Sequence, residues 1–513
     1  MAVISDFVFW CVCIILLSIV WKYFQRRRRW AAIIDKIPGP KGIPIFGVTW
    51  KMLTSRENIA KASRALLEPY GKYPVVRLWA GPFPVILLTK AESAKVLLSS
   101  NKHSDKAIFY RYLMNWIGDG LLTSTGHKWQ QRRKLITPSF HFQILENFLL
   151  VMNEQSKILV QVLEKQSQQN VNSDFDIYPL ISRCTLDIIC ETAMGQGVHA
   201  QLNADSEYLN AVNDLTRVIK MRMNRPWLSP NWIFRLTNAG KIEKEALKIV
   251  HGFTNKIIKM KRENFKTDDD LSQDNEEEIL GKKRRVALLD MLLKESSSGN
   301  QPLTDEDIRE EVDTFMFEGH DTTAVGISWA LYCIGQLPEI QQKMYDELYN
   351  IFGDSDRDAT TEDFHHMKYM DLVLKESLRC FPPVPTYGRA IKEKLEICGY
   401  EIPPGVTVII TPFLVHRDLA NYIKPDEFNP DRFLAENSQN RDPYAFLPFS
   451  AGLRNCIGQK FAVMEEKAVI SRILRSFVVT SVEEKDILSN LVGELVLRPI
   501  RGIKVKLQPR PKI

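Results

Sequence analysis

A glycine-rich loop near the C-terminus holds one cysteine in a setting that favours its thiolate form. The loop runs from Phe449 to Gly458 and reads Phe-Ser-Ala-Gly-Leu-Arg-Asn-Cys-Ile-Gly, with Arg454 two residues before Cys456. Glycines let backbone N–H groups approach the sulfur closely, and a helical pattern that starts at Gln459 puts a helix N-terminus beside it. Both features stabilise a thiolate. Such a thiolate can bind iron, and thiolate donation to haem iron favours cleavage of the O–O bond.

The alternative interpretation of this loop is an incidental cysteine at a helix N-terminus. Chance rarely produces the full pattern Phe-x-x-Gly-x-Arg-x-Cys-x-Gly at average residue frequencies. The loop resembles the cysteine-loop signature of the cytochrome P-450 superfamily. This resemblance implies a haem b (iron protoporphyrin IX) cofactor, with Cys456 as the metal ligand and with Phe449 and Arg454 among the haem-binding residues.

Two threonines beside an acid interrupt a long helical pattern upstream of the loop. The pattern runs from Thr304, a plausible N-cap, to the residue before Pro338, which is about 30 residues or roughly 45 Å. Thr322 and Thr323 are poor choices inside a helix because their hydroxyls compete for backbone groups. They indicate a functional site, with a solvent-facing helix bend as the alternative. The resemblance implies that Asp321 and Thr322 are the acid–alcohol pair that supplies protons during oxygen activation.

The residue type at position 318 differs between branches of the superfamily. The run Glu-Gly-His-Asp-Thr-Thr that starts at Glu318 resembles family four, the fatty-acid ω-hydroxylases, whereas most of the superfamily has a small residue there. In many family-four enzymes this glutamate is esterified to a haem methyl group. A charged carboxylate buried beside haem would be costly, and an ester removes that cost. The resemblance therefore implies covalent haem attachment through Glu318.

A second acid–base motif is expected to have a structural role. Glu376 and Arg379 lie three residues apart on one helix face, and an exposed ion pair is the default interpretation. In the superfamily this pair is buried and is joined by an arginine from a later segment, which Asn-Pro-Asp-Arg-Phe around Arg432 resembles. The triad would hold the region that carries Cys456.

Further positions match residues that bind the haem propionates. Trp129 and Arg133 lie in Trp-Gln-Gln-Arg-Arg on a probable helix, and Arg454 would meet the same charge. Arg389, in Tyr-Gly-Arg-Ala, matches less specifically, with a surface arginine as the alternative. Arginine suits carboxylates because its planar fork donates two hydrogen bonds at once.

The electron source is expected to be a separate protein. The chain has no Gly-rich dinucleotide-binding unit of its own, so electrons would come from NADPH through NADPH–cytochrome P-450 reductase, with cytochrome b5 as a second candidate partner. A basic face could steer an acidic reductase into place, although general surface charge explains the same residues equally well. Its candidate members are Lys128, Arg132, Lys134 and Lys460.

The N-terminus predicts an uncleaved membrane anchor. Val3–Trp21 spans 19 residues with three polar interruptions, and five Lys or Arg residues follow between Lys22 and Arg29. This length is close to the ~20 residues that a spanning helix needs. The charge follows the apolar run, which disfavours the alternative of a cleaved leader and places the rest of the chain in the cytosol, on the endoplasmic reticulum. The expected divisions are an anchor with its basic flank at 1–30, a proline-rich hinge at 31–50 and a catalytic domain at 51–513.

Composition and patterning fit one large mainly α protein with minor β. The 513 residues are 45% apolar and 25% charged, and a net charge of +6 gives no case for nucleic-acid binding. The eight cysteines contain no CxxC pair, which argues against structural zinc and against a disulfide framework. Val75–Leu88 reads as a hairpin, 399–411 as strand and 266–285 as a solvated loop. Met221–Leu236 mixes aromatic and basic residues, which suits a membrane interface or ordinary core packing.

The resemblance, which covers nearly the whole chain, implies a monooxygenase with the haem-thiolate fold. It would insert one oxygen atom of O2 into a C–H bond and reduce the other to water. The terminal carbon of fatty acids is the first expected target, and terpenoid hormones or foreign compounds come next, with pocket residues expected at about 104–122 and 384–387. A haem-thiolate isomerase is disfavoured by the intact pair Asp321 and Thr322, and a non-catalytic haem sensor or lipid-binding membrane protein is the remaining rival.

Overall fold

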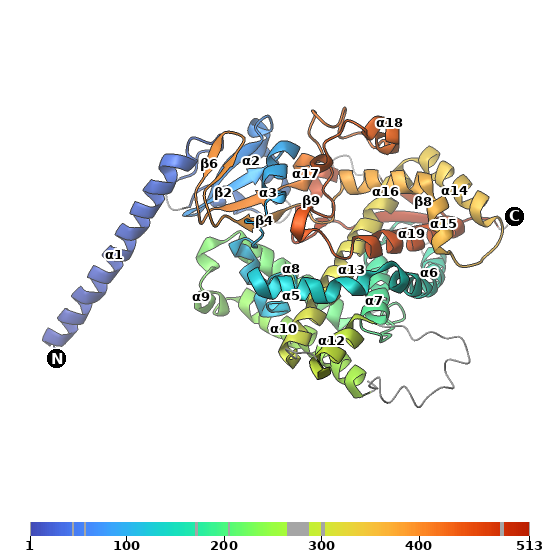
Figure 1. Ribbon diagram of the computed structural model, residues 1–513, viewed down its shortest axis with the longest axis horizontal. Coiled ribbons are helices and arrows are strands. Elements are labelled where there is room, and N and C mark those ends of the chain that lie inside the picture. Colours follow the sequence, from blue (N-terminus) through green and yellow to red (C-terminus); the bar gives the residue numbers. More distant parts are fainter. Residues whose placement is uncertain are drawn as a thin grey trace.

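A helical body with a smaller sheet region beside it makes up most of the chain, and the N-terminal helix projects away from both (Figure 1). The computed structural model describes residues 2–43, 46–55, 58–169, 173–203, 206–263, 287–298, 303–482 and 487–511. The charged segment 266–285 lies outside these ranges. The mainly α architecture with minor β that the sequence predicts is confirmed.

The elements follow one another in chain order with helices throughout and strands near both ends. The first helix is α1 (Ala2–Ile34), followed by α2 (Ile59–Leu67), α3 (Ala91–Leu98), α4 (Met114–Ile117), α5 (Gly126–Ile136), α6 (Phe142–Gln169), α7 (Tyr178–Ala193), α8 (Glu207–Met223), α9 (Asn231–Arg235), α10 (Asn238–Glu263), α12 (Leu288–Ser298), α13 (Asp305–Gln336), α14 (Pro338–Phe352), α15 (Thr361–His366), α16 (Lys368–Cys380), α17 (Pro412–Val415), α18 (Ala435–Ser438) and α19 (Gln459–Ser476). The strands are β1 (Val75–Ala80), β2 (Phe83–Leu88), β3 (Phe175–Asp176), β4 (Tyr387–Ala390), β5 (Leu395–Ile397), β6 (Tyr400–Ile402), β7 (Thr407–Ile410), β8 (Phe477–Ser481), β9 (Leu491–Gly493), β10 (Leu497–Pro499) and β11 (Lys504–Pro509).

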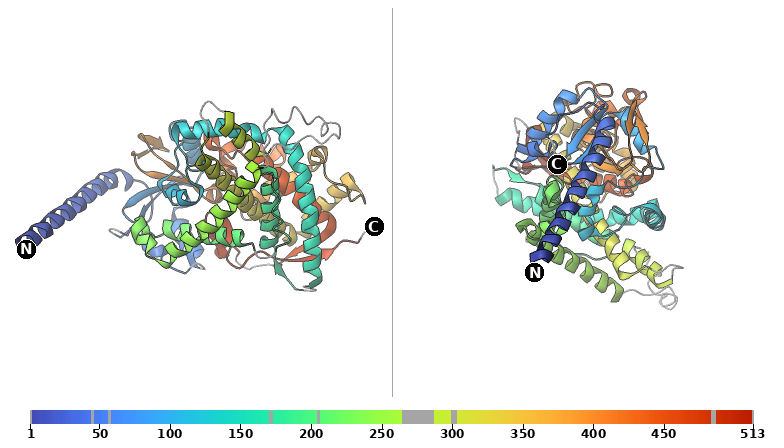
Figure 2. Two further views of the ribbon diagram at one scale, coloured as in Figure 1. Left: turned by 90° about the horizontal axis from the view of Figure 1, so that it is seen from below. Right: turned by 90° about the vertical axis from the view of Figure 1, so that its left-hand side faces the viewer.

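The helix α1 continues past the predicted boundary at residue 30, and the segment after it contacts the sheet region. Figure 2 shows α1 extending from the body at the end opposite the C-terminus. Ile34 and Ile37 are buried in the core of the sheet region. The amide of Arg77 in β1 donates to the carbonyl of Pro38 at 2.8 Å. The predicted start of the hinge at residue 31 is therefore wrong, because α1 continues to Ile34, and the rest of the division at 31–50 stays a prediction.

Single helices of the described chain do not reach the length and hydropathy of a membrane span. Gly126–Phe140 and Ile144–Gln169 pass that test together, as a pair bent by 66°.

The four-stranded sheet has the order β1-β2-β7-β4, and it contains the predicted hairpin and the second half of the predicted strand region 399–411, whose first half, β6, pairs with β5 in a separate sheet. β1 and β2 form the predicted hairpin, and β7 lies parallel to β2 although more than 300 residues separate them. The edge strand β4 also pairs with the segment around Lys106, whose backbone is opposite Arg389. The sheet thus brings two cationic residues from distant parts of the chain side by side.

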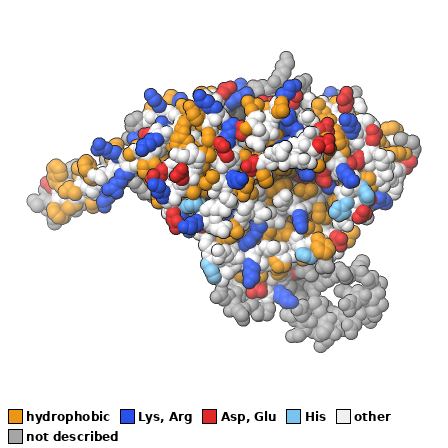
Figure 3. Space-filling model, turned by 45° about the horizontal axis from the view of Figure 1, so that its top comes forward, with side chains coloured by type: hydrophobic (Ala, Val, Ile, Leu, Met, Phe, Trp, Pro, Cys, Tyr) orange, Lys and Arg blue, Asp and Glu red, His pale blue; other side chains and the backbone are white. Residues whose placement is uncertain are grey.

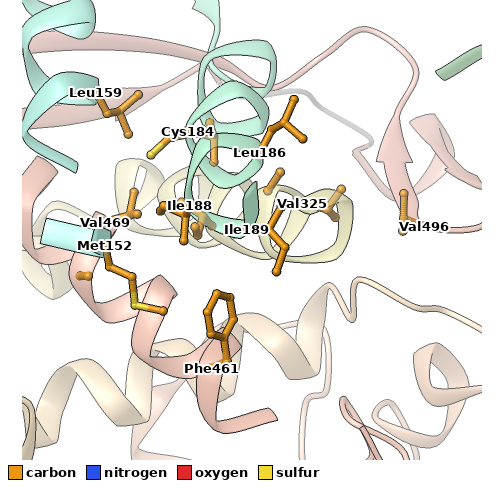
Figure 4. Packing of buried hydrophobic residues seen from close by; sticks show 14 of the residues in the cluster. Met152, Leu159, Cys184, Leu186, Ile188, Ile189, Val325, Phe461, Val469 and Val496 are labelled. Atoms are coloured by element: carbon orange, nitrogen blue, oxygen red, sulfur yellow. The ribbon is translucent and has the colours of Figure 1, made fainter. Parts of the chain in front are cut away.

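The long helix α13 runs through the body and carries its main core. Thr304 caps it in a reciprocal hydrogen-bonded box with Asp307, as the sequence predicts. The helices α7 and α19 pack against it, and α6 packs in turn against α7 and α19. Figure 4 shows Ile189 of α7, Val325 of α13 and Val469 of α19 within this core. An almost wholly buried α13 can hold side chains at fixed positions in the centre of the body.

Two consecutive carboxyl groups of α19 are buried at its contact with α13. Glu465 and Glu466 are 0% and 3% exposed, and three of their four oxygens have no hydrogen-bond partner within the described residues. Burial raises the pKa of Glu466 to about 8 and the pKa of Glu465 well above its ordinary value. A carboxyl group without a cation beside it is costly to ionise in such a place.

Replacing Glu466 with glutamine should reduce the pH dependence of stability. The pKa of this group is about 8 in the fold against an ordinary 4.5, so the folded chain holds the proton more tightly than the unfolded chain. Stability therefore falls as pH rises between these two values. Glu466→Gln removes this fall and should raise the free energy of unfolding at pH 8 by about 1 kcal/mol or more, measured by chemical denaturation at about pH 5 and pH 8.

Glu362→Gln is the matched control, since Glu362 is an exposed glutamate paired with His366 on one helix face. It should change the free energy of unfolding by less than about 0.5 kcal/mol at either pH. If Glu466→Gln kept the pH dependence of the wild type, Glu466 would not be the protonated, unpartnered group described above.

Candidate active site

The cysteine loop folds back on itself immediately before α19. The amide of Cys456 donates to the carbonyl of Phe449 at 2.9 Å. Gly452 has a φ of +69°, and a Cβ on it would lie 2.0 Å from the carbonyl oxygen of Leu98, so only glycine fits there. Gly458 is the N-cap of α19. The tight loop fixes the sulfur at the start of this helix.

The thiol of Cys456 is accessible yet enclosed, so it faces a space inside the protein. Its side chain keeps accessible surface, while burial raises the pKa of the thiol to about 11, with Glu318 adding to the rise. The N–H of Gly458 lowers the pKa of this thiol, as the sequence predicts, but burial raises the pKa by more. The protein alone therefore keeps a thiol here, and the thiolate requires a bound metal cation.

The same space is bounded by one face of α13. Between Glu310 and Gly335 the buried run of α13 is broken at Glu318, Gly319 and Thr322, which lie on one side of the helix. Burial raises the pKa of Glu318 to about 7, and Lys106 partly offsets this rise. Glu318 adds to the rise in the pKa of Cys456, so the carboxyl lies near enough to the thiol to act on its charge.

Three cations border this space, and none of them forms an ion pair with another described residue. Arg389 is 3% exposed and Arg454 is 9% exposed. Burial, with Arg389 adding to it, lowers the pKa of Arg454 to about 9, and burial with both arginines lowers the pKa of Lys106 well below its ordinary value. Nη2 of Arg454 donates to the carbonyl of Ser124 at 2.7 Å, but Nε and Nη1 have no partner within the described chain.

These unpaired donors fit a cofactor with two carboxylates. Like charges on adjacent strands repel, and buried cations are stable only when an anion is close. The guanidinium of Arg454 lies 4.0 Å from the ring of Trp129, and the ammonium of Lys106 lies 4.8 Å from the ring of Tyr110. A thiol opposite a carboxyl, with three cations at one edge, matches the haem and the two propionates that the sequence implies.

The structure brings together most of the predicted cofactor residues but gives Arg133 another contact. Trp129, Glu318, Arg389, Arg454 and Cys456 surround one space, as predicted. Both terminal nitrogens of Arg133 donate to Asn455, at 2.9 Å to its carbonyl and 2.8 Å to its side-chain oxygen. Arg133 thus fixes the residue before the cysteine, and its propionate contact stays a prediction. Sequence reasoning missed Lys106 and Tyr110, because only strand pairing brings them to Arg389.

The acid and the alcohol of the predicted pair point in different directions. The Thr322 hydroxyl donates to the carbonyl of Glu318 at 2.7 Å, on the face that borders the space. Asp321 is wholly buried on another side, where it forms an ion pair with Arg498 of β10 and accepts a hydrogen bond from the Tyr178 hydroxyl at 2.8 Å. No local sequence signal marks Arg498 or Tyr178 as partners of Asp321.

The predicted structural triad is confirmed as a buried network. Arg379 donates to both oxygens of Glu376, at 2.7 Å and 2.8 Å, and both side chains are wholly inaccessible. Arg432 completes the triad with a 3.3 Å contact to Glu376. Sequence reasoning missed His416, whose carbonyl accepts from Arg379 and whose ring nitrogen accepts from the amide of Leu447 at 2.7 Å. Leu447 precedes Phe449 by two residues, so the triad is tied to the cysteine loop.

Two of the four residues of the predicted basic face are paired with carboxylates, and one of these two, Arg132, is buried. Lys128 pairs with Glu310 at 3.0 Å and with Asp119 at 3.3 Å. Arg132 is 7% exposed and pairs with Asp307 and Glu311. The prediction was wrong for Arg132, because α5 lies against the acidic first turns of α13, whereas for Lys128 it stays a prediction. Lys134 and Lys460 are exposed.

The sequence and this site agree with known proteins over almost the whole chain. The family model for cytochrome P450 matches residues 37–507. The chain belongs to the cytochrome P450 family, a monooxygenase class of oxidoreductases that bind haem through a cysteine thiolate.

Its relatives place it in family four. It is 45% identical over 496 residues to cytochrome P450 4V2 of Mus musculus, covering 97% of this chain and 94% of the relative. It is 42% identical over 498 residues to cytochrome P450 4c3 of Drosophila melanogaster, covering 95% and 92%. It is 40% identical over 504 residues to cytochrome P450 4c21 of Blattella germanica, covering 98% and 99%.

Proposed function

We propose that this enzyme hydroxylates the terminal carbon of fatty acids, with O2 and with electrons that NADPH supplies through a separate reductase. The observation that supports this best is Glu318, which borders the internal space one helical turn before Thr322 and opposite Cys456. This glutamate is the residue by which the sequence resembles the fatty-acid ω-hydroxylases of family four. Haem, when bound through Cys456, supplies the activation of O2 that inserts oxygen into a C–H bond.

The residues of this chain would position the cofactor and manage protons. Lys106, Arg389 and Arg454 would bind the two propionates, and the loop of Cys456 would bind the metal. The hydroxyl of Thr322 donates its proton to the carbonyl of Glu318, and rotation about the Cα–Cβ bond of Thr322 would turn the hydroxyl into the space. Asp321 is the buried acid that would resupply this proton after its bond with Arg498 rearranges.

The segments expected to line the pocket offer an apolar wall. Phe109 and Leu122 are partly accessible and pack against the main core, and Val384 does the same against the core of the sheet region. An aliphatic chain has no hydrogen-bonding groups along its length, so such walls suit it and exclude water.

The carbon-monoxide difference spectrum of the dithionite-reduced protein tests the metal ligand. The wild type should give a strongly red-shifted Soret band, because thiolate donation changes the haem electronics, and Cys456→Ser should lose it while Cys398→Ser keeps it. Cys398 is a suitable control because it is exposed in the loop between β5 and β6.

Product analysis of the same wild-type protein tests the substrate. Incubation with medium- or long-chain saturated fatty acids, NADPH and the reductase should yield mainly the fatty acid hydroxylated at its terminal carbon. Omission of the reductase should abolish the product. An imidazole-like spectrum in haem-loaded wild type would contradict the ligand, and products hydroxylated only within the chain would contradict the proposed function.

We further propose that Glu318 forms an ester with a methyl group of the haem. The ester requires a two-electron oxidation of the methyl group, which turnover with O2 can supply, and it removes the cost of a buried carboxylate. After turnover, acidic organic extraction should leave most haem on the wild-type protein and should remove all of it, unmodified, from the isosteric variant Glu318→Gln. Mild base should release a hydroxymethyl haem from the wild type only. Complete release of unmodified haem from the wild type would contradict the ester.

We also propose that α1 anchors the protein in the endoplasmic reticulum membrane, with the body in the cytosol. Figure 3 shows apolar side chains along the outer part of this helix and basic side chains where it nears the body. Trp10 and Trp21 are 64% and 66% exposed, as expected for residues that meet lipid. The exposed Trp232, on the short helix α9, would add a contact with the same surface. Lys134 and the exposed Lys460, which is in the first turn of α19, would contribute to the reductase-binding surface near Cys456.

Deletion of residues 2–25 tests the anchor, because Ile34 and the rest of the sheet-region core remain in place. The full-length protein should stay in the membrane pellet after washing with alkaline carbonate, whereas the truncated protein should be released. In intact microsomes, protease added outside should cleave the body. Release of full-length protein by carbonate, or protection of the body from protease, would contradict the proposal.

A further inference from the structure

The helix α8 carries a lysine in a position that no part of the haem-binding machinery requires. Asn213, Thr216, Lys220 and Met223 follow one another at helical spacing and so share one face of α8. Asn213 accepts a hydrogen bond from Arg498 of β10 at 2.6 Å, which places this face of α8 against the hairpin formed by β9 and β10.

Lys220 lies farther along the same face, beside the turn of the hairpin. Seven residues separate Asn213 from Lys220, which is roughly 10 Å along the helix. Glu494 is at the hairpin turn, four residues before Arg498, and it is close enough to Lys220 to act on its charge. The helix and the hairpin therefore run side by side from Arg498 to Lys220 and Glu494.

The hairpin turn borders the segment that the sequence assigns to the substrate pocket. The amide of Leu497 donates to the carbonyl of Pro383 at 2.8 Å. A Cβ on Gly493 would lie 3.7 Å from Pro385. The helix α2 also contacts β9. The hairpin thus contacts the segment 383–385 directly.

Lys220 is enclosed and has no anion bound to it. Among the described residues it makes no hydrogen bond and no ion pair, and its side chain keeps accessible surface although its neighbours Val218 and Ile219 are buried. Burial lowers the pKa of Lys220, with Glu494 partly offsetting this. Glu318 and Lys106 combine accessibility and enclosure in the same way, so Lys220 also faces an internal space.

We propose that Lys220 and the Glu494 turn form a subsite for the carboxylate of the substrate, at the end of the space away from Cys456. An enclosed ammonium without an anion gains most from a carboxylate, because a charge-assisted hydrogen bond offsets its desolvation. A chain held by its carboxylate at Lys220 directs its terminal carbon toward Thr322 and Cys456. This inference rests on the proposed function, and it identifies the substrates as long-chain acids.

Equilibrium binding to the full-length haem enzyme tests the subsite with hexadecanoic acid and hexadecan-1-ol as probes. Lys220→Met should weaken binding of the acid about tenfold or more and leave binding of the alcohol within about twofold. Lys220→Arg should keep the preference for the acid, since it keeps the charge. Glu494→Gln should tighten acid binding several-fold, because it removes a competing carboxylate. Lys248→Met, at an exposed lysine of α10, is the matched control and should change neither affinity.

The product pattern gives a second readout. Lys220→Met should move hydroxylation of hexadecanoic acid from the terminal carbon toward in-chain positions, with an unchanged carbon-monoxide spectrum. Equal loss of affinity for acid and alcohol would show a packing role and overturn the subsite, as would unchanged affinity for both. If the wild type oxidises fatty acids at the terminal carbon and Lys220→Met behaves like wild type, only the subsite fails. If Lys220 determines acid binding but no terminal alcohol forms, only the proposed function fails.

Discussion

Unbalanced positive charge around one internal space is the constraint on which the site depends. Lys106, Arg389 and Arg454 converge there, and burial depresses the pKa of each, so the protein alone holds them at a cost. The thiol of Cys456 has the complementary problem, since burial raises its pKa to about 11. A cofactor with a metal cation at its centre and two carboxylates at its edge resolves both. The cofactor therefore completes the electrostatics of this fold as well as its chemistry.

Contacts elsewhere in the molecule hold these charged side chains and the cysteine loop in position. The sheet pairs the segment of Lys106 with the strand of Arg389, while Arg133 holds Asn455 beside Cys456. Behind the loop, the buried pair of Glu376 and Arg379 reaches the cysteine loop through His416. Removing one member of such a pair leaves a buried charge uncompensated, which typically costs about 3–5 kcal/mol.

Local sequence patterns predicted the elements and the cofactor residues, whereas contacts between distant segments could not be predicted. The capping box at Thr304 and the glycines around Cys456 determine structure within a few residues, so the sequence predicts α13 and the loop correctly. An arginine is usually exposed, and Arg132 is buried only because α5 packs on α13. The partnership of Asp321 and Arg498 spans 177 positions along the chain, and it depends on where one short hairpin lies.

That hairpin contacts both Asp321 and the segment expected to line the pocket. Arg498 holds Asp321 from β10, on the side of α13 away from the Thr322 hydroxyl. The turn of the same hairpin carries Glu494 and is bonded to the pocket segment through Leu497 and Pro383. A short hairpin moves largely as one piece, because its two strands share backbone hydrogen bonds. The same hairpin therefore contacts both the buried acid, through Arg498, and the segment expected to line the pocket, through Leu497, so the positions of these two parts depend on one element.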